Sequence, residues 1–332
     1  MLFSEIRGHS RALGLLTRVM STGRLAHAYL FSGPDGIGKA TVAREMAASL
    51  FCTEKDTPEP CGHCPGCRQY DSGNHPDFIH VQPDGVSIKI DRIRALKKQL
   101  AFSPFAGGMR VILIEEAQTM RREAANSLLK LLEEPPPDNL FLLIASDAEP
   151  ILPTIVSRCQ VVAFAPLADD IAAEIIGMHA PELDGQTSLM LAGLSGGCPG
   201  RALTMEAGDV LPLRDQVVAA LLEQRWPRAR AVEEALFLAR EMAGLNSGFD
   251  LLLDLLRLFF KDGMLATLGS ESPSYSGADD SKDPLLLRER WNLSQLSDKM
   301  RAIDAATDAL ARNCNRALVC EVLMLNLIET DP

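Results

Sequence analysis

The sequence predicts an α/β region followed by an all-helical region, and three observations support this. Across residues 1–165, four short apolar runs alternate with helical stretches, which is typical of a parallel sheet covered by helices on both faces. From about residue 211 the pattern is helical throughout, and the stretches 249–260 and 318–328 are too apolar to be anything but core helices. The 332 residues suffice for two or three domains.

The strands of the α/β region are predicted where apolar runs lie between turns and helical stretches. The four runs are "AYLF" (28–31), "FIHV" (78–81), "RVILI" (110–114) and "LFLLIA" (140–145). The first run continues through a glycine-rich turn into the helical stretch "TVAREMAASLF". Strand, glycine turn and helix in this order are typical of a phosphate-binding unit.

The domain boundaries are predicted at residues 165 and 210. Residues 166–210 contain two helical patterns after Pro166 and end in "SGGCPGRAL", so we expect a small helical domain there. Residues 211–332 form a third, helical domain. Its one interruption, residues 269–284, is rich in Ser, Asp, Gly and Pro and is predicted to be a surface loop.

Composition and charge exclude several classes of protein. The 47% hydrophobic content with 5% aromatic residues is that of an ordinary globular protein. The net charge of -11 argues against a freestanding nucleic-acid binder, because affinity for phosphate backbones depends on clustered Lys and Arg. The longest apolar runs are far too short to span a membrane, and the first 20 residues contain no signal-peptide pattern, so we expect a cytoplasmic protein.

The glycine-rich turn follows the phosphate-binding pattern G-x-x-x-x-G-K-[ST] up to its last position. Gly33, Gly38 and Lys39 match, and Gly36 lies between them. In such a loop the backbone N–H groups and the helix N-terminus face an anion, and the lysine reaches the β- and γ-phosphates. The alternative is a glycine-rich turn without a ligand; the strand and helix around it favour a nucleotide site.

Both positions that should hold Mg²⁺ are altered. Ala40 stands where a Ser or Thr hydroxyl would bind the ion, and Thr41 is rotated by about 100° around the helix. Glu115 and Glu116 follow the strand 110–114, where Asp-Glu is usual. There the first acid anchors Mg²⁺ and the second polarises the attacking water, but Glu115 is one methylene longer than Asp. Alternatively, the two acids simply end a strand at the surface.

Four cysteines crowd into residues 52–67 with the spacing C-x8-C-x2-C-x2-C. They are Cys52, Cys61, Cys64 and Cys67. Four thiolates that converge in a reducing compartment fit a tetrahedral Zn²⁺ ion with no open position for catalysis. A redox pair and an iron–sulfur cluster are the alternatives, and His63 is expected to face solvent.

Longer stretches extend the pattern beyond these single motifs. They are "LAHAYLFSGPDGIGKAT", "SGNHPDF" after the cysteines, "AANSLLKLLEEPPPDNLFLLIAS" and "LPTIVSRCQ". These stretches resemble the clamp-loader ATPases of bacterial DNA polymerase III. The resemblance covers residues 2–205 densely and the last helical stretch, "NCNRALVCEVLMLNL", more loosely.

The resemblance implies a three-domain subunit of a ring of five. Residues 1–165 would be an AAA+ nucleotide-binding domain with the zinc insert at 52–67, residues 166–210 a helical lid, and residues 211–332 a collar. The implied partners are the gamma/tau and delta subunits, the sliding clamp, and primed DNA contacted through the assembly. Such rings use ATP to open the clamp and place it on DNA.

The resemblance also suggests roles for three further residues. Ser146 lies near the sensor 1 position, Arg201 of "PGRAL" near the sensor 2 position, and Arg158 of "SRC" resembles an arginine finger that acts on a neighbouring subunit. Taken alone, Arg158 is more simply a surface or ion-pairing residue. The candidate nucleotide-binding residues are therefore Gly33, Gly36, Gly38, Lys39, Ala40, Thr41, Ser146 and Arg201.

Two functions remain open on this basis. One is a mostly non-hydrolysing architectural subunit, for which ATP with Mg²⁺ is a doubtful cofactor; the other is an active gamma/tau-like ATPase motor. The changes at Ala40 and Glu115, and the absence of the long extension of tau after the helical region, favour the architectural subunit. A third interpretation, an unrelated zinc-dependent DNA-binding protein, is disfavoured by the sequence pI of about 5.1.

Overall fold

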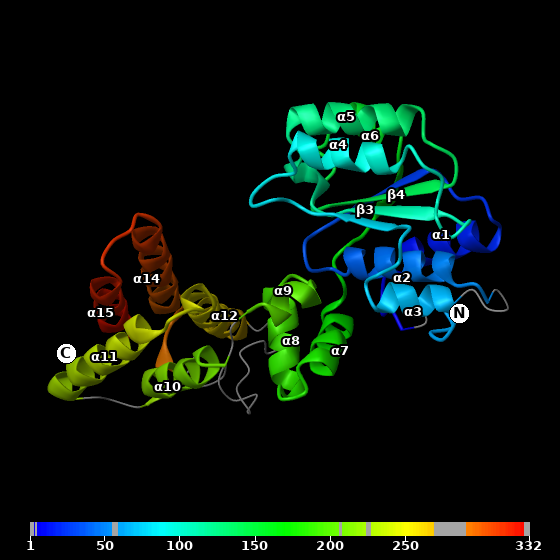
Figure 1. Ribbon diagram of the computed structural model, residues 1–332. Helices are drawn as coiled ribbons and strands as arrows, with labels where there is room; N and C mark the ends of the chain where they lie inside the picture. Colours follow the sequence, from blue (N-terminus) through cyan, green and yellow to red (C-terminus); the bar gives the residue numbers. More distant parts are fainter. Residues whose placement is uncertain are drawn as a thin grey trace. The chain divides into compact units, whose positions relative to one another are not determined.

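The computed structural model describes residues 3, 5–54, 59–205, 208–223, 227–268 and 290–328 (Figure 1). The chain divides into two compact units. The first comprises Met1–Ile175 together with Ser195–Arg201, and the second comprises Ile176–Leu194 together with Ala202–Pro332. The finer division at residues 165 and 210 stays a prediction.

The first unit is built on a five-stranded sheet in which every neighbouring pair is parallel. The strand order is β2-β3-β4-β1-β5. The strands are β1 (Ala28–Ser32), β2 (Phe78–Val81), β3 (Arg110–Ile114), β4 (Asn139–Ala145) and β5 (Gln160–Ala163). The four predicted strands are confirmed, and β5 is additional. β5 is a short edge strand that buries only Val162.

Helices cover both faces of this sheet (Figure 1). On one face lie α1 (Ser10–Ser21), α2 (Lys39–Phe51) and α3 (Pro65–Asp71); on the other lie α4 (Ile90–Gln99), α5 (Arg122–Glu133) and α6 (Pro153–Val156). Each face has its own core. Phe31, Val42 and Met46 belong to the first, and Ile112, Leu128 and Phe141 belong to the second. The short helix η1 (Ala117–Thr119) also belongs to the first unit, whereas α7 (Asp169–His179) and α9 (Pro199–Leu203) each have residues in both units.

The second unit is helical in its described part. Its helices are α8 (Gly185–Leu194), α10 (Val210–Leu222), α11 (Arg228–Gly244), α12 (Phe249–Thr267), α14 (Leu293–Ala311) and α15 (Arg316–Leu327). α11 packs on α15, and α12 packs on α10 and α14. The predicted core helices at 249–260 and 318–328 are confirmed as α12 and α15. The predicted surface loop at 269–284 lies outside the described residues.

Hydropathy gives one further finding. Within the described ranges, no helix is long and apolar enough to cross a membrane.

The sheet sets the position of the functional segments. The glycine-rich turn follows β1, and Glu115 follows β3. Because all strands run in the same direction, both segments lie at the carboxyl edge of the sheet, where ligands bind in open α/β folds.

Candidate nucleotide and metal sites

The glycine-rich turn leads directly from β1 into α2, and two of its glycines lie against other backbone segments. A Cβ atom on Gly33 would lie 2.2 Å from the carbonyl oxygen of Phe164, and one on Gly36 would lie 2.3 Å from the backbone nitrogen of Arg201. Both glycines have positive φ angles, 154° and 75°. Only glycine fits these positions, so close backbone packing sets the path of the loop.

Lys39 is the first residue of α2, and its side chain is folded into the loop. Only 4% of this residue is exposed. Its ammonium group donates hydrogen bonds to the carbonyl oxygens of Gly33 (2.5 Å) and Pro34 (2.6 Å), and a carboxylate oxygen of Asp35 lies 3.6 Å away. Burial lowers the pKa of Lys39, and Asp35 acts in the opposite direction. The Lys39 ammonium group is thus bound by carbonyl oxygens of the loop that precedes it.

Glu115 lies at the end of β3 with both carboxylate oxygens engaged by protein donors. Arg44 Nη2 lies 2.7 Å from Oε1, His80 Nε2 lies 3.2 Å from the same oxygen, and Gln82 Nε2 donates to Oε2 at 3.3 Å. The His80 hydrogen bond is the main cause that lowers the pKa of Glu115. Arg44 follows Ala40 by four residues, so the two lie on the same face of α2. The guanidinium therefore reaches the acid above the small side chain of Ala40.

These residues do not fit a Mg²⁺ site. Ala40 supplies no oxygen and is partly buried against the core. Thr41 is exposed and lines a cavity of about 290 Å³ with Cys67 and Tyr70, beside the cysteine insert. Glu116 is exposed, with a φ angle of 51°. Mg²⁺ demands near-octahedral oxygen coordination, and Glu115 already has three protein partners.

The structure places the two predicted sensor positions near this loop. Ser146 directly follows β4, and its N–H donates to the side chain of Gln118 at 3.4 Å. Its neighbour Ala145 accepts a hydrogen bond from the N–H of Gly33 at 3.3 Å. On the side of α9, the N–H of Gly200 donates to the carbonyl oxygen of Gly36 at 2.7 Å, which holds the backbone of Arg201 against the loop.

Arg158 lies elsewhere in the first unit. It precedes β5, whereas the glycine-rich turn follows β1, and the two strands are parallel neighbours that pair Tyr29 with Gln160. Arg158 is therefore at the opposite edge of the sheet, separated from the turn by the length of a four-residue strand, about 13 Å. The glycine-rich turn of the same chain is therefore out of reach of the Arg158 side chain.

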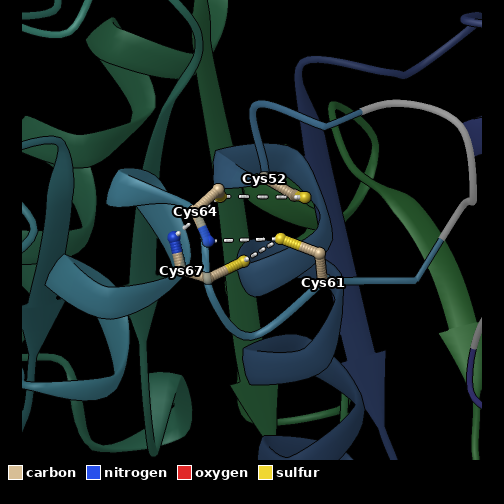
Figure 2. A group of neighbouring side chains, drawn as sticks. All are labelled: Cys52, Cys61, Cys64 and Cys67. Carbon is tan, nitrogen blue, oxygen red and sulfur yellow. Dashed lines mark hydrogen bonds between the residues drawn. The ribbon is translucent and has the colours of Figure 1, made fainter.

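The four clustered cysteines converge on one point (Figure 2). Cys52 follows α2, Cys64 caps the N-terminus of α3, Cys67 lies within α3, and Cys61 comes from the preceding loop. The sulfur atoms of Cys52 and Cys64 lie 4.0 Å apart, as do those of Cys61 and Cys67. All four lie within 4.8 Å of one another.

The chemistry of this cluster fits a thiolate-bound metal ion. A tetrahedral site with Zn–S bonds of 2.3 Å places its sulfurs about 3.8 Å apart. The backbone N–H groups of Thr53 and Cys67 point at Cys64 Sγ at 3.4 Å, and that of Cys64 points at Cys61 Sγ at 3.3 Å. Hydrogen bonds from Thr53 and Cys67 lower the pKa of Cys64 to about 5, whereas burial raises the pKa of Cys67 to about 12. The cluster could hold a metal ion, and its donors favour the charged form of Cys64.

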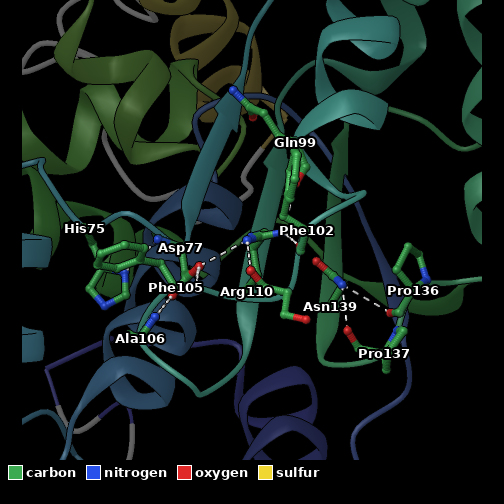
Figure 3. Close-up of polar contacts among 11 residues, drawn as sticks. His75, Asp77, Gln99, Phe102, Phe105, Ala106, Arg110, Pro136, Pro137 and Asn139 are labelled. Carbon is green, nitrogen blue, oxygen red and sulfur yellow. Dashed lines mark hydrogen bonds and ion pairs between the residues drawn. The ribbon is translucent and has the colours of Figure 1, made fainter.

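A buried ion pair lies next to this region and was not predicted (Figure 3). Asp77 and Arg110 are both buried, and Arg110 Nη2 lies 3.4 Å from Asp77 Oδ1. Asp77 also accepts hydrogen bonds from the backbone N–H groups of Phe105 (2.7 Å) and Ala106 (2.8 Å). Asp77 stands in the quoted stretch "SGNHPDF", but no sequence signal identifies its partner 33 residues away.

The same ion pair fixes the loop between α4 and β3. The Arg110 guanidinium donates to the carbonyl oxygens of Phe102 and Ser103, both at 2.9 Å. Phe102 and Phe105 are nevertheless 74% and 86% exposed. The loop is thus held from its backbone while its two aromatic side chains face solvent.

Part of the chain is similar to known proteins. A family model described as "DNA polymerase III, delta subunit" matches residues 8–168. The DNA polymerase III subunit delta' of Bacillus subtilis is 44% identical over 157 residues, which are 47% of each chain. The delta' subunit of Pseudomonas aeruginosa is 38% identical over 196 residues, 58% of this chain and 60% of that one.

The relatives also include tau and gamma subunits of DNA polymerase III. The DNA polymerase III subunit tau of Escherichia coli is 39% identical over 158 residues, 47% of this chain and 24% of that one. The chain thus spans about half the length of the first curated relatives it matches.

Among solved structures, a DNA polymerase III gamma subunit-related protein from Thermotoga maritima is 19% identical to this chain, with a TM-score of 0.41. The match covers 94% of this chain and 98% of that one. Residues 8–168 contain the glycine-rich turn, Glu115, Arg158 and the cysteine cluster. Over this region, the chain is similar to DNA polymerase III delta' subunits and to their gamma/tau relatives.

Proposed function

We propose that the chain is a delta prime-like subunit of a DNA polymerase III clamp loader. It would be a mostly non-hydrolysing, architectural subunit that helps to load the sliding clamp onto primed DNA. The single observation that carries this proposal is the state of Glu115, whose two carboxylate oxygens are occupied by Arg44, His80 and Gln82. With Ala40 as its counterpart on α2, the site lacks the oxygen ligands that Mg²⁺-dependent hydrolysis needs.

Nucleotide binding is a separate matter from hydrolysis. The loop keeps its backbone N–H groups and Lys39, so the proposal includes weak or moderate ATP binding with little hydrolysis. An incoming phosphate would have to replace the carbonyl partners of Lys39. The motor alternative would require Mg²⁺ at both altered positions, and no observation favours it.

The cysteine cluster is proposed to hold a structural Zn²⁺ ion. Cys52, Cys61, Cys64 and Cys67 would supply all four ligands, which leaves no open position for catalysis. The ion would tie the end of α2 to α3.

The proposed partners are gamma/tau and delta subunits, the sliding clamp, and primed DNA reached through the assembly, in the cytoplasm. The names of the relatives support the first of these. The net charge of -11 supports indirect rather than independent DNA binding. The predicted lid (166–210) and collar (211–332) would supply contacts within the ring.

Arg158 is proposed to act as an arginine finger on a neighbour's ATP. It lies at the sheet edge opposite its own loop, so only the γ-phosphate of another subunit could receive it. A guanidinium supplied in trans can be worth about 10³–10⁵ in rate at the site it serves. Ser146 and Arg201 are proposed as sensor residues beside the loop.

A reconstituted complex tests these assignments. The chain would be assembled with gamma/tau and delta subunits, and ATP hydrolysis and clamp loading on primed DNA would be measured. We expect Lys39→Ala in this chain to leave both rates near wild type, and Arg158→Ala to slow both, with poor rescue by Arg158→Lys because lysine lacks the planar fork. A Lys39→Ala complex that stops hydrolysing ATP would show a motor subunit. Unchanged rates with Arg158→Ala in an intact complex would remove the finger.

A further inference from the structure

Arg158 is held in one orientation by acceptors from two elements. Its Nη2 lies 2.9 Å from Glu133 Oε1, and its Nη1 donates to the carbonyl oxygen of Thr154 at 3.0 Å and to Ser157 Oγ at 3.3 Å. Among the described residues, Nε has no acceptor. The guanidinium is therefore fixed through two of its three nitrogens, while the third remains available to a further acceptor.

Of these three acceptors, Glu133 alone is charged and comes from another element. It is the last residue of α5, whereas Thr154 lies in α6 and Ser157 caps it. The two residues are 25 positions apart in the sequence, so their contact depends on how α5 and α6 pack and not on a local turn. The Arg158 and Glu133 side chains are 36% and 43% exposed, so the pair lies at the surface, within reach of a neighbouring subunit.

We propose that Glu133 is the positioning residue of Arg158: it holds the guanidinium in one orientation, in which Nε stays available to the phosphate of a neighbouring subunit. This inference rests on the proposed function of Arg158 as a finger. A long arginine side chain samples many rotamers when free, and donors that are already oriented need no reorganisation as charge develops on the phosphate. Glu133 would not touch the nucleotide; it would act through Arg158.

Chemical modification of the isolated full-length chain tests the placement without any activity assay. Glu133→Gln would be compared with Glu134→Gln, a matched control one residue on, because Glu134 is exposed and contacts Arg158 in no described interaction. The probe is phenylglyoxal, and the readout is the rate of modification of Arg158 by mass spectrometry. We expect a several-fold faster reaction in Glu133→Gln and the wild-type rate in Glu134→Gln. Equal rates in all three chains would overturn the proposal.

Steady-state kinetics of the reconstituted complex test the consequence. We expect Glu133→Gln to lower kcat for ATP about two- to five-fold, the range that one exposed ion pair accounts for, with KM unchanged. In an Arg158→Ala complex the same substitution should have no further effect, because the two residues act as one unit. A decrease that simply adds to that of Arg158→Ala would show a structural role and contradict the proposal.

The two experiments separate this proposal from the proposed function. If Arg158→Ala leaves hydrolysis unchanged, the finger itself fails, and the modification rates alone report whether Glu133 positions Arg158. If Arg158→Ala slows hydrolysis while Glu133→Gln equals wild type in both assays, the finger stands and Glu133 has no part in it.

Discussion

At the residue scale, the Glu115 carboxylate lies among donors from three side chains, Arg44, His80 and Gln82. That Ala40 and Glu115 depart from the phosphate-loop pattern follows from the sequence alone. The partner of Glu115 does not, because Arg44 is 71 residues away and the ion pair depends on how α2 lies over the end of β3. Only the folded structure shows that the Glu115 carboxylate contacts Arg44.

The first prediction concerns this ion pair. Glu115→Gln removes the charge that faces Arg44 and His80, and we expect it to lower the free energy of unfolding by about 1 kcal/mol, the scale of a partly exposed, charged hydrogen-bond cluster. The matched control is Glu116→Gln, because Glu116 is exposed and should change stability by less than about 0.5 kcal/mol. Urea unfolding of both variants is the measurement. Equal stabilities would mean that the Glu115 cluster contributes nothing.

The second prediction concerns pH. Because hydrogen bonding lowers the pKa of Glu115 in the folded chain, its contribution is fully present above the ordinary value of 4.5 and is lost as pH falls through the lower, folded value. Unfolding curves between pH 6 and pH 3 should therefore converge for wild type and Glu115→Gln as the pH falls. A difference between them that stays constant down to pH 3 would contradict the charge-based account.

At the scale of elements, the sheet and the long helices were predictable, but the edge strand β5 was not. The buried strands β1, β3 and β4 have continuous apolar runs, whereas β5 has one buried residue. The four-cysteine insert was also predictable as a unit from its spacing. The buried contact of Asp77 with Arg110 was not, since it joins β3 to the residue just before β2.

The third prediction concerns the insert that links α2 to α3. Purified protein should contain about one zinc ion per chain, and Cys64→Ser should release it, because three thiolates bind zinc more weakly than four. Hydrogen exchange should then increase in residues 59–71 and stay unchanged in α12. The control is Cys314→Ser, since Cys314 is exposed and far along the chain from the cluster. Stoichiometric iron, or no metal in reduced protein, would refute the zinc assignment.

At the scale of the whole molecule, the order of an α/β region before an all-helical one was predictable from periodicity. The assignment of residues 195–201 to the first unit was not, because it follows from backbone contacts such as that of Gly200 with Gly36. Gly200 therefore packs against the glycine-rich loop, and Lys39 donates hydrogen bonds to two carbonyl oxygens of that loop. The acid that follows β3 and the lysine of the loop are thus both paired with partners inside the chain.

The central claim, a nucleotide-site framework without hydrolysis, is tested most directly by phosphate release from the purified chain at saturating ATP and Mg²⁺. Lys39→Ala, which removes the ammonium group proposed to bind phosphate, sets the background for contaminating ATPases. The account predicts that the wild-type chain releases phosphate no faster than Lys39→Ala. Magnesium-dependent release well above that background, lost in Lys39→Ala, would contradict it and identify an active motor.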